Sequence, residues 1–147
     1  MSAAGYSGTQ LPRKLGIRDG SRVLLVHAPT GFAAALGELP EGARIVDAGE
    51  GLDVVVVFVS ELADLRAQFA GLAASIDPAG GVWVAWPKRA SGIATDVNEN
   101  RVREIGLEAG LVDNKVCAID TIWSGLRFVV RLRDRPRGPG RRRGLSG

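Results

Sequence analysis

A run of seven residues, Asp53–Val59, constrains the fold of this chain more than any other feature. Its sequence, DVVVVFV, is apolar at consecutive positions and does not alternate with polar residues. Successive side chains of a β-strand point to opposite faces of the sheet, so both faces of such a strand need cover. The run therefore predicts a central strand with helices packed on both sides of its sheet.

Strand and helix patterns alternate along the rest of the chain. Strands are predicted at 22–27, 43–47, 82–86, 112–119 and 126–132, and helices at 32–36, 60–76 and 97–109. Ser60 is expected to cap the second helix, and Asp96 with Glu99 forms a capping box for the third. The short link before the last strand predicts an antiparallel pair. The order favours a three-layer α/β sandwich with a mostly parallel sheet of about six strands and a C-terminal antiparallel hairpin.

Length and composition divide the chain into three parts. With 147 residues it is expected to form one domain, at 16–132. Residues 1–15 are small and polar and are expected to lie over the domain surface as an N-terminal arm. Residues 133–147 consist mainly of Arg, Pro and Gly, which predicts a disordered basic tail.

The charge is concentrated at the C-terminus. Residues 131–147 hold seven arginines and one aspartate, a net charge of +6, while residues 1–130 carry a net charge of −3. A mildly acidic body does not favour a nucleic-acid surface. The segment 131–143 could bind nucleic acid through its arginines, but it lacks aromatic residues for base stacking, and a solubilising tail is the simpler interpretation.

Several classes of site and location are disfavoured. Cys117 is the single cysteine and lies among apolar residues, which predicts an inert buried thiol and a reducing compartment. The chain holds too few Cys and His residues for a usual zinc site, so no metal is expected. The N-terminus lacks the features of a signal peptide, and the longest apolar run, Val54–Val59, is too short to span a membrane. We therefore expect a cytoplasmic protein.

The turn after the first strand occupies the usual ligand-binding position of an α/β fold. Val23–Val26 is apolar and is followed by His27-Ala28-Pro29-Thr30-Gly31 and a short helix. A turn that cradles a cofactor needs glycines, so that backbone can approach the ligand closely. Here His27 adds an imidazole, and Pro29 fixes φ and removes an N–H donor.

The strand order resembles the class I methyltransferase fold, whose first turn follows the approximate pattern V-L-D-x-G-x-G-T-G. On this chain the pattern falls on Val23–Gly31, where Thr30 and Gly31 match it. Leu25 replaces the acid, and His27 and Pro29 replace the first two glycines. The resemblance implies S-adenosylmethionine as a possible cofactor, with Asp47 as the acid that would bind the ribose. The substitutions argue against the standard mode of binding.

Over nearly its full length the chain is also similar to a family from high-GC Gram-positive bacteria, domain of unknown function 3052. This resemblance implies a fold and a bacterial cytosolic setting, but no activity. The residues that carry it are Gly5–Thr9, Lys14–Ile17, Trp83–Lys88, Ser91-Gly92, Thr95-Asp96, Val116–Ala118 and Trp123–Leu126.

Candidate binding residues cluster at the predicted carboxyl edge of the sheet, where ligands of open α/β folds bind. They are His27, Thr30, Gly31, Asp47, Trp86, Lys88, Arg89, Ser91 and Trp123. Lys88 and Arg89 either grip an anionic ligand or acidic partner, or form a solvated basic loop. Trp86 and Trp123 either frame an aromatic pocket or partner surface, or belong to the core.

No catalytic constellation is visible around His27, the only histidine. Together with the substituted turn, this favours a non-catalytic binding or regulatory module without a cofactor, acting on a protein partner or a small anionic ligand. A divergent S-adenosylmethionine-dependent methyltransferase is the first alternative. A nucleic-acid-associated protein that uses segment 131–143 is the second.

Overall fold

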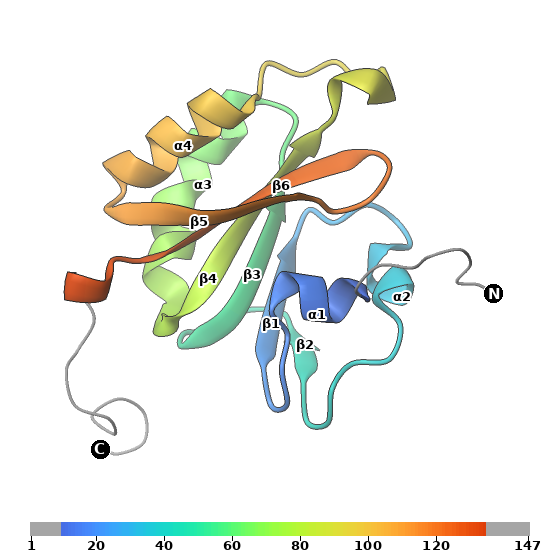
Figure 1. Cartoon of the computed structure of the whole chain (residues 1–147), viewed down its shortest axis with the longest axis vertical. Helices are drawn as coiled ribbons and strands as arrows, with labels where there is room; N and C mark the ends of the chain where they lie inside the picture. Colours follow the sequence, from blue (N-terminus) through green and yellow to red (C-terminus); the bar gives the residue numbers. More distant parts are fainter. Residues whose placement is uncertain (1–9, 135–147) are drawn as a thin grey trace.

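Six strands form one sheet in the order β2-β1-β3-β4-β6-β5 in the computed structural model, which describes residues 10–134 (Figure 1). The strands are β1 (Arg22–Val26), β2 (Arg44–Val46), β3 (Leu52–Phe58), β4 (Ile76–Pro87), β5 (Leu111–Ala118) and β6 (Trp123–Val130). The α-helices are α1 (Leu11–Leu15), α2 (Phe32–Leu36), α3 (Leu62–Ser75) and α4 (Glu99–Glu108), and two 3-10 helices are η1 (Arg89–Ser91) and η2 (Leu132–Asp134).

The pairing confirms the predicted mostly parallel sheet. β1 pairs in parallel with β2 and β3, and β3 pairs in parallel with β4. β6 is antiparallel to both of its neighbours, β4 and β5. The predicted C-terminal antiparallel hairpin is therefore present, and β6 lies between the two strands that precede it in the chain.

Alternate residues of β3 build two separate cores. Val55 and Val57 belong to the cluster that α3 and α4 cover, whereas Val54 and Val56 belong to the cluster that α1 and α2 cover. All four valines are at most 2% exposed. The central, doubly covered strand predicted from DVVVVFV is confirmed, and Figure 1 shows the two pairs of helices on opposite faces of the sheet.

The expected N-terminal arm is partly integrated into the core. Residues 11–15 form α1, whose Leu15 is fully buried, and the Nε1 of Trp83 donates a hydrogen bond of 2.9 Å to the Leu15 carbonyl. Pro12 suits the first turn of a helix, and Gly16 ends it with a left-handed φ of 86°. The segment Leu11–Leu15 holds a proline and two basic residues, so its sequence lacks the apolar pattern that predicted the helix at 32–36. Residues 1–9 and most of the predicted tail lie outside the described residues, as does the greater part of segment 131–143.

Both predicted helix caps are wrong, because a different side chain accepts a hydrogen bond from the first turn of each helix. The N–H of Leu62, at the start of α3, donates to Oδ1 of Asp96 (2.8 Å), so Asp96 caps α3 in place of Ser60. Asn98 caps α4, because its Oδ1 accepts from the N–H of Arg101 (3.0 Å). The hydroxyl of Thr95 donates to the Ser60 carbonyl (2.7 Å). The loop before α4 is thereby fixed to the start of α3, and the Ser60 hydroxyl is left without a partner among the described residues.

Within residues 10–134, no helix combines the length and the apolar character needed to cross a membrane.

Candidate functional site at the carboxyl edge of the sheet

The topology opens a crevice where β1 and β3 lie side by side. The chain leaves β1 through α2, which packs on one face of the sheet, and leaves β3 through α3, which packs on the other. Connections that diverge in this way make a topological switch point, at which open α/β folds bind their ligands. The carboxyl ends of β1 and β3 are therefore the place to look for a site.

A cavity of about 550 Å³ lies at this point, within the usual size range of small-molecule sites. We call it the strand-end cavity. Strands β1 and β3, helix α3 and the start of β6 all contribute to it. Its lining residues are His27, Phe58, Val59, Ser60, Asp64, Ala67, Gln68 and Trp123.

The lining of the strand-end cavity is acidic and aromatic. Asp64 is its one carboxylate, and neither lysine nor arginine is among the described lining residues. The rings of Phe58 and Trp123 meet edge to face, with centroids 5.1 Å apart. Gln68 lies one helical turn beyond Asp64, on the same side of α3. A carboxylate beside aromatic rings favours a ligand that carries a positive charge on an apolar body.

His27 has a backbone conformation that is usual for glycine. Its φ is 57°, and no other non-glycine residue in the described part of the chain has a positive φ. Left-handed backbone costs about 1 kcal/mol for a residue with a Cβ, although His tolerates it better than most. The bend thus resembles that of a glycine turn, but an exposed imidazole now lines the cavity.

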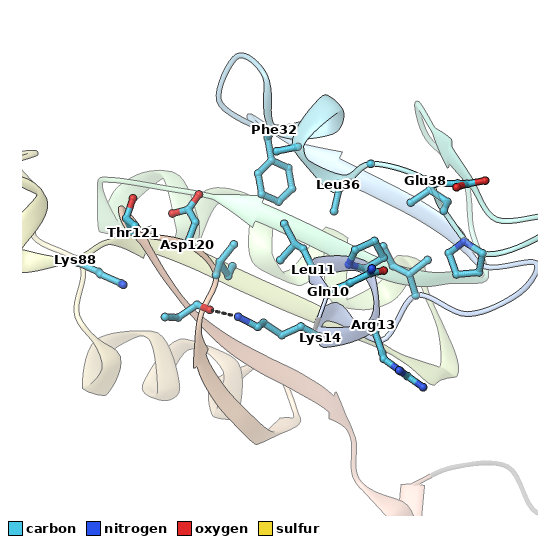
Figure 2. Close-up of a pocket in the computed structure, with 18 residues that line it drawn as sticks. Gln10, Leu11, Arg13, Lys14, Phe32, Leu36, Glu38, Lys88, Asp120 and Thr121 are labelled. Atoms are coloured by element: carbon cyan, nitrogen blue, oxygen red, sulfur yellow. Dashed lines mark hydrogen bonds between the residues drawn. The ribbon is translucent and has the colours of Figure 1, made fainter. Parts of the chain in front are cut away.

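A larger cavity of about 1060 Å³ lies between α1, α2 and the β5–β6 turn (Figure 2). Figure 2 shows Leu11, Phe32 and Leu36 near its centre, and Lys88 with Asp120 toward one end. The Phe32 ring also contacts the Phe58 ring, with centroids 4.8 Å apart. A row of three rings, completed by Trp123, therefore connects the linings of the large cavity and the strand-end cavity.

Hydrogen bonds hold α1, the end of β5 and the β5–β6 turn in place around this row of three rings. The Lys14 ammonium donates to the Ala118 carbonyl (3.1 Å), which ties α1 to the end of β5. Oδ1 of Asp120 accepts from the N–H groups of Ile122 and Trp123, each at 2.8 Å. The turn that presents Trp123 is thus held by its own aspartate.

The structure brings together only part of the predicted set. His27 and Trp123 line the strand-end cavity, and Lys88 lines the large cavity. Thr30, Gly31, Asp47 and Arg89 are exposed and line none of the cavities found among the described residues.

Trp86 and Trp123 do not frame one pocket. Trp86 is 7% exposed and belongs to the core under α3 and α4, whereas Trp123 packs with the core on the α1 and α2 face. The interpretation of Trp86 as a core residue is the one that the structure supports. Ser91 is half-buried, and its Oγ accepts a hydrogen bond of 3.1 Å from the N–H of Ile93, which stabilises the turn after β4.

Only His27 and Trp123 of the eight residues that line the strand-end cavity were among the predicted binding residues, and Phe58, Asp64 and Gln68 are the most informative of those missed. Phe58 ends the apolar run, so the pattern assigns it to the core. Asp64 reads as a residue that stabilises the positive end of a helix dipole, and Gln68 has no distinguishing signal. The i, i+4 spacing of Asp64 and Gln68 at the start of a helix that follows a central strand is the signal that could have found them.

Cys117 is half-buried, whereas the sequence predicts a fully buried thiol. Burial raises the pKa of its thiol, and the nearby charges of Lys14 and Lys115 act in the opposite direction. Among residues 10–134, no group of three or more His, Cys, Asp or Glu side chains is placed to hold a metal ion.

No known family model and no curated protein sequence matches this chain. Solved structures do match. The chain superposes on a TehB-like SAM-dependent methyltransferase from Corynebacterium glutamicum with a TM-score of 0.55 and 12% identity, covering 88% of this chain and 92% of that one. For precorrin-6y C5,15-methyltransferase from Geobacter metallireducens the TM-score is 0.60, the identity 10%, and the coverage 82% and 86%.

A third match is magnesium protoporphyrin IX methyltransferase from Synechocystis with bound SAM. Its TM-score is 0.56 and its identity 12%, with 82% of this chain and 74% of that chain covered. At these identities the likeness concerns the fold. The chain therefore shares the Rossmann-like fold of class I S-adenosylmethionine-dependent methyltransferases.

Proposed function

We propose that this chain is a divergent S-adenosylmethionine-dependent methyltransferase that holds its cofactor at the strand-end cavity. One observation carries the proposal: an acidic, aromatic cavity lies at the switch point of a fold shared with such enzymes. The sequence alone favours a non-catalytic module. The solved structures favour the methyltransferase instead, because they are methyltransferases and the Synechocystis enzyme holds bound SAM.

The lining residues fit the charged centre of this cofactor. S-adenosylmethionine, when bound, supplies a methyl group on a positively charged sulfur. Asp64 would balance that charge, and the rings of Phe58 and Trp123 would offer their negative faces to it. The free hydroxyl of Ser60 and the amide of Gln68 would hydrogen-bond the polar groups of the ligand. Neither lysine nor arginine in the described lining opposes these contacts.

The turn after β1 would hold the cofactor differently from a glycine loop. The imidazole of His27 occupies space at the cavity, and Pro29 offers no N–H. Asp47 follows β2 at the same edge, one residue past the pair formed by Leu24 and Val46. We assign the ribose hydroxyls to Asp47, and we expect the rest of the ligand to lie nearer to α3 than in a glycine-loop enzyme.

We propose that the methyl acceptor binds in the large cavity. Its apolar residues Leu11, Phe32 and Leu36 would cover an apolar body. The Lys88 side chain lines the same cavity and has no carboxylate partner among the described residues, so it would pair with an anionic group. We therefore propose a small amphipathic anion as the acceptor class.

We also propose that the chain is a relative of domain of unknown function 3052 and works in the cytoplasm of an actinobacterium. The stretches that carry this resemblance meet in space. Trp83–Lys88 lies in and just after β4, and Trp123–Leu126 pairs with it from β6. Leu15, from the stretch Lys14–Ile17, accepts the Trp83 hydrogen bond. Their convergence around both carboxyl-edge cavities supports a shared role for them.

Isothermal titration calorimetry of the full chain with S-adenosylmethionine and S-adenosylhomocysteine tests the proposal. We expect binding in roughly the micromolar range, weakened by Asp64→Asn and by Asp47→Ala. Glu104→Gln, which removes an exposed acid on α4, is the matched control and should leave the affinity unchanged. No binding of either ligand at roughly millimolar concentration would overturn the proposal in favour of the non-catalytic module.

A further inference from the structure

A third cavity, of about 610 Å³, lies at the opposite edge of the sheet, near the amino ends of β1, β3 and β4. We call it the cationic cavity. It is enclosed by α1 and the turn after it, by the starts of these strands, and by β5 and β6. Its lining residues are Arg13, Lys14, Leu15, Gly16, Ile17, Arg18, Ser21, Asp53, Asp77, Ala79, Lys115 and Arg127.

The charges of this lining do not balance. Five basic side chains face two carboxylates, so the formal net charge is +3. Both carboxylates already accept hydrogen bonds, Asp53 Oδ2 from the N–H of Arg22 and Asp77 Oδ2 from the N–H of Ala79, each at 2.9 Å. The charges of Arg13 and Arg18 are therefore left without a carboxylate partner in the described part of the chain.

Two of the basic side chains face each other across strands. Lys115 on β5 and Arg127 on β6 are register partners, so their side chains leave the sheet on the same face. Like charges at directly opposed positions repel and destabilise a sheet. Lys115 donates to the Lys14 carbonyl (3.3 Å) and Arg127 to Oδ1 of Asn114 (3.5 Å), and an anion bound between the two cations would offset their repulsion.

A glycine provides the room for one of these side chains. The guanidinium of Arg127 lies against Gly81, where a Cβ would come within 2.7–2.8 Å of its atoms. The guanidinium group of Arg127 therefore packs directly against the backbone of Gly81 in β4. The planar guanidinium is suited to bidentate contact with phosphate or carboxylate oxygens.

The polar atoms of the cavity are mostly donors. The last four carbonyls of α1 are already hydrogen-bonded. The Pro12 carbonyl accepts from the N–H of Ile17, and the Arg13 carbonyl accepts from the N–H of Gly16. The Lys14 carbonyl accepts from the Lys115 ammonium, and the Leu15 carbonyl accepts from Nε1 of Trp83. Ser21 and Asp77 are the two buried polar residues in the described chain, and both line this cavity. The Ser21 Oγ accepts from the N–H of Arg18 (2.9 Å), while its own hydroxyl hydrogen has no acceptor among residues 10–134.

We propose that the cationic cavity binds a small phosphate monoester whose body carries hydroxyl groups. Arg18, Lys115 and Arg127 hold the phosphate, and the Ser21 hydroxyl donates to it. The carboxylates of Asp53 and Asp77 accept hydrogen bonds from hydroxyl groups of the body. This site lies at the edge of the sheet away from the strand-end cavity, so it does not depend on the methyltransferase proposal.

Thermal unfolding of the full chain with inorganic phosphate, ribose 5-phosphate or sodium chloride at matched ionic strength tests the proposal. Both phosphates should raise the Tm above the value in chloride, and ribose 5-phosphate should raise it more. Titration calorimetry with ribose 5-phosphate should show binding that weakens about tenfold in the double variant Arg18→Gln, Lys115→Gln. Arg101→Gln, an exposed and unpaired arginine on α4, is the control and should bind as the unmodified chain does.

Gly81→Ala provides a second, independent test. The three atoms nearest to the added methyl group all belong to the flexible end of Arg127, so the chain should fold normally while the guanidinium is displaced. We expect weaker binding of ribose 5-phosphate with an unchanged Tm in chloride. A Tm in phosphate equal to that in chloride, or an affinity that is the same in all of these variants, would overturn the proposal. Binding of S-adenosylmethionine should be unaffected in every variant.

Discussion

The two edges of this sheet present cavities of similar volume and opposite character. The strand-end cavity, of about 550 Å³, has one carboxylate, the rings of Phe58 and Trp123, and neither lysine nor arginine in its described lining. The cationic cavity, of about 610 Å³, has five basic residues and two acids. At the carboxyl edge the lining comes from strand ends and the first turns of α3. At the amino edge it comes from α1 and the face of the antiparallel pair β5–β6.

This difference indicates that the antiparallel pair contributes to the cationic site as well as closing the sheet. β6 pairs with β4 from Gly81 to Pro87 and β5 pairs with β6, and this antiparallel pair supplies Arg127 and Lys115 to the lining of the cationic cavity. We therefore expect ligands of opposite charge at the two ends of one core. Substitutions in each lining should affect one cavity and leave the other unchanged, unless the two cavities are coupled.

Trp83→Phe should have the largest effect. Trp83 is 1% exposed, and its Nε1 donates the hydrogen bond that holds the Leu15 carbonyl of α1. Losing this donor leaves a buried acceptor unpaired, and the smaller ring leaves a void, so the free energy of unfolding should fall by about 3 kcal/mol. Urea denaturation measures this loss.

The same variant discriminates between the cavities. α1 supplies Arg13 and Lys14 to the cationic cavity and nothing to the strand-end cavity. Affinity for ribose 5-phosphate should therefore drop, whereas affinity for S-adenosylmethionine should stay within about twofold. An equal loss for both ligands would mean that the two cavities are not independent.

Asp64→Lys should have the next largest effect, because it reverses the charge at the strand-end cavity. We expect binding of S-adenosylmethionine to weaken by about 2 kcal/mol, roughly 30-fold, since a carboxylate contact is replaced by like-charge repulsion. Calorimetry gives the affinity, and Glu104→Lys on α4 is the matched control. If Asp64→Lys leaves the affinity intact, Asp64 does not face the cofactor.

His27→Gly should have a smaller effect, and it should be favourable. The left-handed φ of 57° is a natural conformation for glycine, so relief of backbone strain should raise the free energy of unfolding by up to about 1 kcal/mol. Removal of the imidazole also opens the strand-end cavity. Tighter binding of S-adenosylmethionine would support the proposed obstruction by His27, whereas weaker binding would show that the imidazole contacts the ligand.

The smallest effect concerns the thiol beside the cationic cavity. Lys14 and Lys115 lower the pKa of Cys117 against the larger effect of burial, which raises it. Lys115→Gln removes one of these charges, so the pKa should rise further and iodoacetamide alkylation should move to higher pH. Lys88→Gln, at the carboxyl edge, serves as control. An unchanged alkylation profile in Lys115→Gln would show that Lys115 does not act on this thiol.

Much of the fold could be predicted because its signals are local. The consecutive valines of β3 identify a strand that is covered on both faces, and the short link between β5 and β6 predicts their antiparallel pairing. The cap of α3 could not be predicted, because Asp96 lies 34 residues from Leu62 and reaches it only through the folded loop. α1 was missed for a different reason: it holds Pro12 and two basic residues, and the hydrogen bond of Leu15 to Trp83 joins positions 68 residues apart.

The sequence could predict which edge of the sheet carries the candidate site, but not which side chains face each other there. Sequence order placed His27 and Trp123 near the carboxyl edge, and both line the strand-end cavity. It could not show that Trp86 and Trp123 leave the sheet on opposite faces, because that depends on the register between β4 and β6. The pairing of Lys115 with Arg127 depends on the register between β5 and β6, which includes an irregularity at Asn114.

The most direct test is a pair of nuclear magnetic resonance titrations on the ¹⁵N-labelled full chain, one with S-adenosylmethionine and one with ribose 5-phosphate. We predict that S-adenosylmethionine shifts the amide signals of Ser60, Asp64 and Gln68, and that ribose 5-phosphate shifts those of Arg18, Ser21 and Lys115. Little overlap between the two sets is expected. If S-adenosylmethionine shifts no signal at the carboxyl edge, or if both ligands shift one common set, the assignment of separate sites to the two edges is contradicted.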